Sequence, residues 1–175
     1  MKIKTWQIIV VIICIILGTL LHFTYDWSGR NLLVSLFSAV NESTWEHLKL
    51  VFMPITLMAI IGYFIIWRKN KNYWTSQALA IIVAMGFITV FFYTYTGIIG
   101  TNYAILDISS FIISIILGEY VAYQILISKT DYKAEIISIV LIISLLLSFA
   151  VYTINPPKIQ YFKDPTTGKY GIWLD

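Results

Sequence analysis

The chain has 175 residues, of which 59% are hydrophobic and only 12% are charged. Soluble domains carry about 25% charged residues, so this composition excludes an ordinary water-soluble fold and predicts a single membrane domain over residues 1–175. The formal net charge of +3 is small and scattered. It therefore argues against nucleic acid as a partner and leaves the lipid bilayer.

Five apolar stretches are long enough to cross a membrane as helices, which takes about 20 residues. The first covers residues 6–26 and follows a short basic start. Its apolar run exceeds the roughly 7–15 residues of a signal-peptide core, so we interpret it as an uncleaved helix. The others are expected at residues 44–67, 75–99, 108–128 and 135–154. The chain is thus predicted to be an all-α membrane protein with five transmembrane helices.

A short apolar run at residues 31–40 cannot span the bilayer. Polar residues recur along this run at close to the helical period: Asn31, Ser35, Ser38 and Glu42. This pattern fits a short amphipathic helix lying in the membrane surface. An ordered loop is the alternative.

The tail, residues 155–175, begins with Asn155-Pro-Pro157, which ends the last helix because proline cannot continue it. Aromatic segments then flank the sequence Asp164-Pro-Thr-Thr-Gly168. Asp at its start, Pro fixing φ and Gly at its close are typical of a tight turn. The tail is therefore predicted to form a β-hairpin.

Basic residues predict the orientation in the membrane. They cluster in short segments at helix ends, at residues 2–4, 68–71 and 129–133. The positive-inside rule gives such segments the most weight. We therefore expect a multi-pass protein of the cell membrane with its N-terminus in the cytoplasm. With five spans, the tail and the segment Asn41–Lys49 lie outside.

The segment Asn41–Lys49 is the densest group of polar residues in the chain, directly before the second span. Ser43 with Glu46 three residues later is typical of a capping box at a helix start. Two carboxylates, an imidazole and an ammonium fall within it. Such a group at the start of an apolar helix predicts a binding site or a tightly specified interface. Its candidate binding residues are Asn41, Glu42 and Lys49.

Side chains of the first two spans are expected at one depth near the outer boundary. A helical rise of about 1.5 Å per residue places His22 about 26 Å above the inner end of the first helix. The same rise places His47 about 30 Å above Arg68 on the second. The two helices are therefore predicted to approach each other there, with His22 in contact with Glu46 or His47. Further candidates at this depth are Asp26, Tyr93 and Tyr95.

One interpretation of this layer is a site for a divalent metal such as zinc. His22 and Asp26 supply two ligands, and either His47 or Glu46 a third. Neighbouring residues on a helix diverge by about 100°, so the other one is free to act as a general base on metal-bound water. That arrangement would suit a membrane-embedded hydrolase acting on a lipid or peptide. The sequence holds no His-Glu-x-x-His motif.

Two other interpretations stay open. In the first, the layer binds a small molecule or an ion, with Glu119 as a titrating group. In the second, the layer is structural, with Glu46 paired to Lys49 and Asp26 paired to Arg30 on their own helices. The sequence favours a small-molecule or ion-binding membrane protein of unknown activity. The metal-dependent hydrolase is the alternative, and a structural partner protein comes third.

Glu119 lies inside the fourth span, about 15 Å above Lys129 by helical rise. A carboxyl at that depth needs a partner, a proton or a water-filled cavity. The expected hydrogen-bond donors are Tyr123 and Gln124. Glu119 is then a second catalytic candidate beside Glu46, at the floor of a cavity whose mouth is the outer layer.

Several motifs resemble one known family: His22-Phe-x-Tyr-x-Trp-Ser-Gly29, then Phe37-Ser-Ala-Val-Asn-Glu-Ser-x-Trp-Glu-His-x-Lys49, then Pro156-Pro157 and Phe162-x-Asp-Pro-x-x-Gly-x-Tyr-Gly171. Together they are similar to an uncharacterised family of small integral membrane proteins from Gram-positive bacteria. The resemblance covers the whole chain, and the segment Asn41–Lys49 is its most specific part. It implies membrane residence and no assigned activity.

Overall fold

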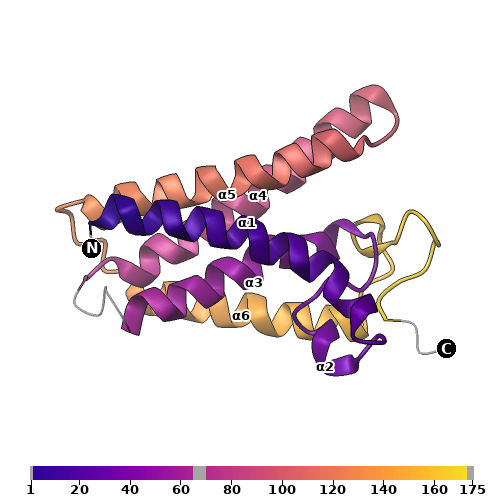
Figure 1. Ribbon diagram of the computed structural model, residues 1–175, viewed down its shortest axis with the longest axis horizontal. Helices are drawn as coiled ribbons and strands as arrows, with labels where there is room; N and C mark the ends of the chain where they lie inside the picture. Colours follow the sequence, from indigo (N-terminus) through magenta and orange to yellow (C-terminus); the bar gives the residue numbers. More distant parts are fainter. Residues whose placement is uncertain (1, 65–69, 173–175) are drawn as a thin grey trace.

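The computed structural model describes residues 2–64 and 70–172, and in this part of the chain helices joined by loops make up the fold (Figure 1). Two short helices, α2 (Leu32–Ser35) and the 3-10 helix η2 (Gln160–Phe162), accompany the long ones. Five helices are long and apolar enough to cross a membrane: α1 (Ile3–Trp27), α3 (Thr44–Gly62), α4 (Tyr73–Ile99), α5 (Ala104–Ile127) and α6 (Glu135–Ile154). The predicted all-α class and the five candidate spans are confirmed.

Helix α3 forms the centre of the bundle. Its apolar window is 72% buried, against 22–28% for the other four helices. It packs against α1, α4 and α6, while α5 packs against α1 and α4. The surrounding helices expose apolar residues, for example Ile8, Ile12 and Ile16 on α1. This outer surface suits lipid, and the buried polar groups gather inside the bundle.

The long helices alternate in direction, so their connections fall at two ends of the bundle (Figure 1). We call the end with residues 2–4, 70–72 and 128–134 the N-terminal end. The opposite end, which we call the tail end, holds α2, the segment 36–43 and the tail. The α4–α5 hairpin leans away from the other helices as it approaches this second end.

The bounds of the spans lie close to those predicted. Helix α6 matches at both ends, whereas α5 begins four residues earlier than expected, at Ala104. Helix α1 ends at Trp27, where Gly29 and Arg30 adopt positive φ values of 68° and 61°. The predicted end of the second span, residue 67, lies outside the described residues.

The predicted surface helix over residues 31–40 reduces to the single turn α2. Asn31 caps this turn through a hydrogen bond from Leu33 N. Ser35 and Ser38 are fully buried and face the bundle, whereas Leu33 and Phe37 are exposed. The helix stops after Ser35, and the backbone carbonyls of Ser35 and Ser38 accept hydrogen bonds from Lys49 Nζ in place of a further helical turn.

The predicted β-hairpin in the tail is wrong. Residues 155–172 contain one isolated antiparallel bridge, between Lys163 and Tyr170, and no strand. The turn itself is present, because Asp164 accepts hydrogen bonds from Thr166 N and Thr167 Oγ1. Pairing stops after this bridge because the chain bends back to α6.

That bend occurs at Gly171, whose φ is +64°. Immediately after it, Ile172 N donates to Thr153 O near the end of α6, at 3.0 Å. The tail therefore folds over the helix end instead of extending as a strand.

The close packing of α4 on α5 requires Gly118. A Cβ atom there would lie 2.6 Å from Ala80 O and 3.2 Å from Ala84 Cβ. Gly86, also on α4, is a matched control, because a Cβ atom there would meet nothing within 4 Å.

We predict that Gly118→Ala lowers the free energy of unfolding by about 1–3 kcal/mol, since a backbone carbonyl cannot move aside. Gly86→Ala is expected to be neutral, or stabilising by up to about 1 kcal/mol through helix propensity. Thermal unfolding of the purified protein in detergent measures both. Equal stabilities would contradict the close packing at Gly118.

Candidate functional site

Glu46 and Lys49 form a buried ion pair at the tail end of α3. Lys49 Nζ lies 2.6 Å from Glu46 Oε2, and the two residues are 0% and 1% exposed. The spacing i,i+3 places both side chains on one face of the helix. Lys49 Nζ also donates to Ser35 O at 2.8 Å and to Ser38 O at 3.2 Å. The ammonium thus has three acceptors: the Glu46 carboxylate, the carbonyl of the last residue of α2, and a carbonyl in the segment after it.

The Glu46 carboxylate is equally well supplied with donors. Val40 N donates to Oε2 at 3.2 Å, and Thr153 Oγ1 on α6 donates to Oε1 at 2.8 Å. The predicted capping box is half formed: Ser43 Oγ accepts from Glu46 N, but Ser43 N donates to Asn41 Oδ1. The Glu46–Lys49 pair therefore ties together α3, α6 and the segment 35–40.

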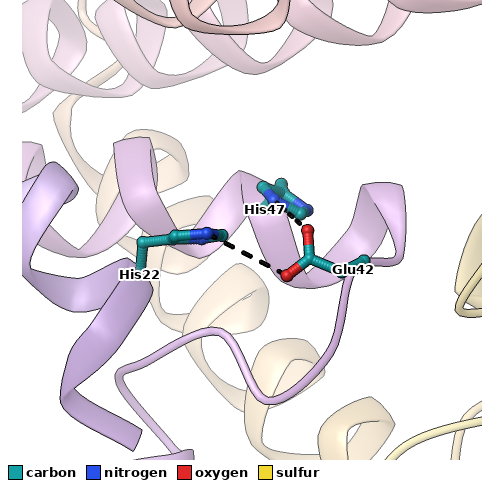
Figure 2. Close-up of side chains that lie close together, drawn as sticks. All are labelled: His22, Glu42 and His47. Atoms are coloured by element: carbon teal, nitrogen blue, oxygen red, sulfur yellow. Dashed lines mark ion pairs between the residues drawn. The ribbon is translucent and has the colours of Figure 1, made fainter. Parts of the chain in front are cut away.

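A second group of side chains lies nearer the surface of the tail end. We call it the His22–Glu42–His47 cluster (Figure 2). His47 Nε2 lies 3.3 Å from Glu42 Oε2, and His22 Nε2 lies 3.9 Å from Glu42 Oε1. When one possible ligand atom is taken from each residue, the three atoms all lie within 4.8 Å of one another. Figure 2 shows the carboxylate between the two imidazoles, which come from α1 and α3.

A hydrogen bond to the backbone determines which nitrogen of His47 carries a proton. His47 Nδ1 lies 3.0 Å from Ser43 O. A carbonyl oxygen only accepts, so Nδ1 is the donor. The other nitrogen, Nε2, faces the Glu42 carboxylate. In neutral imidazole this places a lone pair against a negative oxygen, which is unfavourable unless a proton or a cation lies between them.

Glu42 is held in place by its neighbours in the chain. Asn41 Nδ2 donates to Gly171 O at 3.2 Å, and Asn41 Oδ1 accepts from Ser43 N at 2.9 Å. The hydrogen bond with His47 lowers the pKa of the Glu42 carboxyl below its ordinary value, although partial burial acts in the opposite direction. Glu42 is therefore a carboxylate at neutral pH.

The structure brings together some of the predicted residues and not others. His22 and His47 are in contact as predicted, with ring centroids 5.3 Å apart. The third member is Glu42, which the sequence predicts only as a binding residue. Asp26 instead pairs with Arg30, at 3.6 Å, and its side chain is 76% exposed. Glu46 points into the bundle toward Lys49, as the 100° divergence from His47 requires.

The two outer tyrosines of α4 lie outside the cluster. Tyr93 Oη is 3.3 Å from Thr44 Oγ1, and its ring stacks on Tyr161. Tyr95 is buried and its hydroxyl donates to Asp107 at the start of α5. Both side chains thus connect elements near the tail end.

Glu119 lies away from the cluster. Its donor is Gln7, whose Nε2 lies 2.8 Å from Glu119 Oε2, and not the predicted Tyr123 or Gln124. Gln7 and His22 are 15 residues apart on α1, which corresponds to about 22 Å. Glu119 therefore lies far below the outer layer, and a cavity joining the two stays a prediction. Gln7 is a polar residue within the apolar run of α1, and this could have indicated that it contacts a buried polar group on another helix.

Five apolar helices around a buried polar network define a multi-pass membrane protein. The model of a family described as "Family of unknown function (DUF6512)" matches residues 1–172, and the chain belongs to that family. No curated protein and no solved structure matches the chain. The resemblance to an uncharacterised family is confirmed at this level, and an origin in Gram-positive bacteria stays a prediction.

Removing one partner of the buried pair tests its role. We predict that Lys49→Met lowers the free energy of unfolding by about 3–5 kcal/mol, because the Glu46 carboxylate is left buried without its cation. The double variant Glu46→Gln/Lys49→Met is expected to recover part of this loss, since no charge remains.

Thermal unfolding in detergent measures both variants. Arg30→Met, which removes a cation from an exposed pair, is the control and should cost less than about 1 kcal/mol. A Lys49→Met variant as stable as this control would contradict the role assigned to the buried pair.

Proposed function

We propose that this protein binds a divalent transition-metal ion, with zinc as the best match, at the His22–Glu42–His47 cluster. The arrangement of His47 carries the proposal, because its Nδ1 proton is donated to Ser43 O while Nε2 faces a Glu42 oxygen at 3.3 Å. Two imidazole nitrogens and one carboxylate oxygen are a donor set typical of zinc.

The spacing of the ligand atoms supports the proposal. Around a tetrahedral zinc ion with bonds of about 2.0–2.1 Å, neighbouring ligand atoms lie about 3.4 Å apart. His47 lies 3.3 Å from one oxygen of Glu42, and His22 lies 3.9 Å from the other. With one ligand atom from each residue, the three atoms lie within 4.8 Å of one another, so the side chains must move closer together to bind one ion. The imidazole side chains are about one-third exposed, at 31% and 33%, so an ion reaches them from outside.

The backbone contact of His47 serves as an outer-shell interaction for such an ion. Histidine ligands of metals usually donate their second ring proton to a carbonyl or a carboxylate, which fixes the tautomer. Ser43 O fills this role for His47. Without a metal, protonation of the histidines relieves the same electrostatic conflict with Glu42. Protons and the metal therefore compete for the cluster.

A metal-dependent hydrolase is the second candidate. Three protein ligands leave a coordination position for water, as in catalytic zinc sites. However, Glu46, the general base suggested by the sequence, has both oxygens occupied by Lys49, Val40 and Thr153. An enzyme of this type would need another base. We therefore favour metal binding as the function.

We also propose that the N-terminal end of the bundle faces the cytoplasm. Lys2, Lys4, Lys71, Lys129 and Lys133 all belong to this end. The positive-inside rule then places the His22–Glu42–His47 cluster and the tail outside. The metal would reach the cluster from the extracytoplasmic side.

Metal content tests the main proposal. Purified protein stripped with a chelator and then dialysed against zinc should bind about one zinc per chain, measured by elemental analysis. Removing a ligand, in His22→Ala, Glu42→Gln or His47→Ala, should weaken binding by at least about 10-fold. Lowering the pH should weaken it too, since protons compete for both imidazoles.

Asp26→Asn is the matched control, since Asp26 lies one turn from His22 on α1 but outside the cluster. It should bind zinc like the parent protein. No zinc in the parent, or equal binding in the His47→Ala variant, would refute the site.

Topology is tested separately. Single cysteines at Lys71 and Thr166, in a variant without Cys14, should react oppositely with an impermeant thiol reagent on intact cells. Thr166 is expected to be labelled and Lys71 protected, because the helices place them at opposite ends of the bundle. Labelling of Lys71 alone would reverse the orientation, and labelling of both would contradict the five-span topology.

A further inference from the structure

Glu119 is a buried carboxyl that the metal site does not use. The residue is 1% exposed and its side chain faces α1 from α5. Gln7 Nε2 donates to Glu119 Oε2 at 2.8 Å and lies 3.3 Å from the Glu119 backbone oxygen. The second carboxyl oxygen, Oε1, is buried and has no hydrogen-bond partner in the described part of the chain. Half of this carboxyl is therefore unsatisfied.

No cation within residues 2–64 and 70–172 forms an ion pair with Glu119. Helices α1 and α4 pack against α5, and each brings one titratable group near the carboxyl: Cys14 and Tyr73. Cys14 is fully buried. Tyr73 donates its hydroxyl to Ala59 O at 2.6 Å, so its proton is already engaged. Neither group compensates a negative charge on Glu119.

An ionised carboxyl in these surroundings is strongly disfavoured. A charge inside the membrane needs an opposite charge, several hydrogen bonds or water, and Glu119 has one side-chain donor. A carboxylic acid carries no charge, so the cost of burying a charge does not arise. Its carbonyl oxygen, Oε2, keeps the bond from Gln7, and the proton resides on Oε1.

We propose that Glu119 is a proton-binding site within the spanning region, separate from the His22–Glu42–His47 cluster. The carboxyl holds its proton at neutral pH in the closed structure. On release, the Oε1–H bond breaks, its electron pair stays on the carboxylate, and a water molecule takes the proton. Water reaches Oε1 only when α1 moves away from α5, so protonation and the α1–α5 contact are coupled.

Labelling of glutamate provides a direct test, because the chain has only four: Glu42, Glu46, Glu119 and Glu135. Protein carrying ¹³C in the glutamate carboxyls is reconstituted in nanodiscs for NMR and infrared spectroscopy. One of the four carboxyls should be protonated at about pH 7. Its signal should disappear in Glu119→Gln.

The matched control is Glu135→Gln, which alters the carboxylate that accepts from Trp74 N and Thr75 N at the start of α4. It should retain the protonated signal. Four ionised carboxyls in the parent protein, or a protonated signal that survives Glu119→Gln, would overturn the proposal. If Glu119→Gln fails to fold, Gln7→Leu provides the assignment, since loss of the Gln7 donor should shift the protonated signal.

Cys14 reports on the coupled movement, since it is the only cysteine and lies buried near Glu119. Its alkylation by a membrane-permeant maleimide is measured between about pH 6 and about pH 9. The rate should rise more steeply with pH in the parent than in Glu119→Gln, which shares the thiol chemistry but cannot ionise. Identical pH profiles would refute the coupling.

The same measurements on His47→Ala separate this proposal from the metal site. That variant should lose zinc and keep both the protonated carboxyl and the steep alkylation profile. Loss of the protonated carboxyl signal in His47→Ala would contradict the independence of the two sites.

Discussion

The tail end of this bundle depends on one interaction, the buried ion pair between Glu46 and Lys49. Burying two charges is costly, and the cost is offset only when every remaining hydrogen-bonding position is filled. Here those positions are filled by the backbone carbonyls of Ser35 and Ser38, one backbone amide and the Thr153 hydroxyl of α6. The connection between α1 and α3 therefore has little freedom, because displacing it would leave a buried charge unsatisfied.

This constraint divides the polar residues of the segment Asn41–Lys49 into two groups. Glu46 and Lys49 face inward, and their polar atoms are fully engaged in buried contacts that hold the fold together. Glu42 and His47 face the other way and meet His22, with their side chains partly open to the outside. The fixed connection and the Asn41–Gly171 contact determine where Glu42 lies. The structural interpretation of the segment thus applies to Glu46 and Lys49, and the proposed binding site uses Glu42 and His47.

Much of the fold could be predicted because hydrocarbon leaves a spanning chain few options besides helices, and apolar runs report their number. The contact of His22 with His47 followed from counting helical rise along two straight elements. Glu42 as the third member could not be found in this way, since its position depends on Asn41 reaching Gly171, 130 residues away. Gln7 and Glu119, 112 residues apart, illustrate the same limit. The tail does not form the predicted hairpin because its backbone turns back at Gly171 and donates a hydrogen bond to Thr153 O on α6.

The spacing of Glu46 and Lys49 also bears on how the protein enters the membrane. A charged residue delivered alone into the bilayer costs about 2.5–3.5 kcal/mol on insertion scales. These two residues lie one turn apart on α3 and need no other helix to neutralise each other. The central helix can therefore leave the insertion machinery as an electrically neutral segment. Helix α6 is synthesised after α3, so Thr153 reaches Glu46 only later. Until then Lys49 already neutralises Glu46, and no unpaired charge lies in lipid.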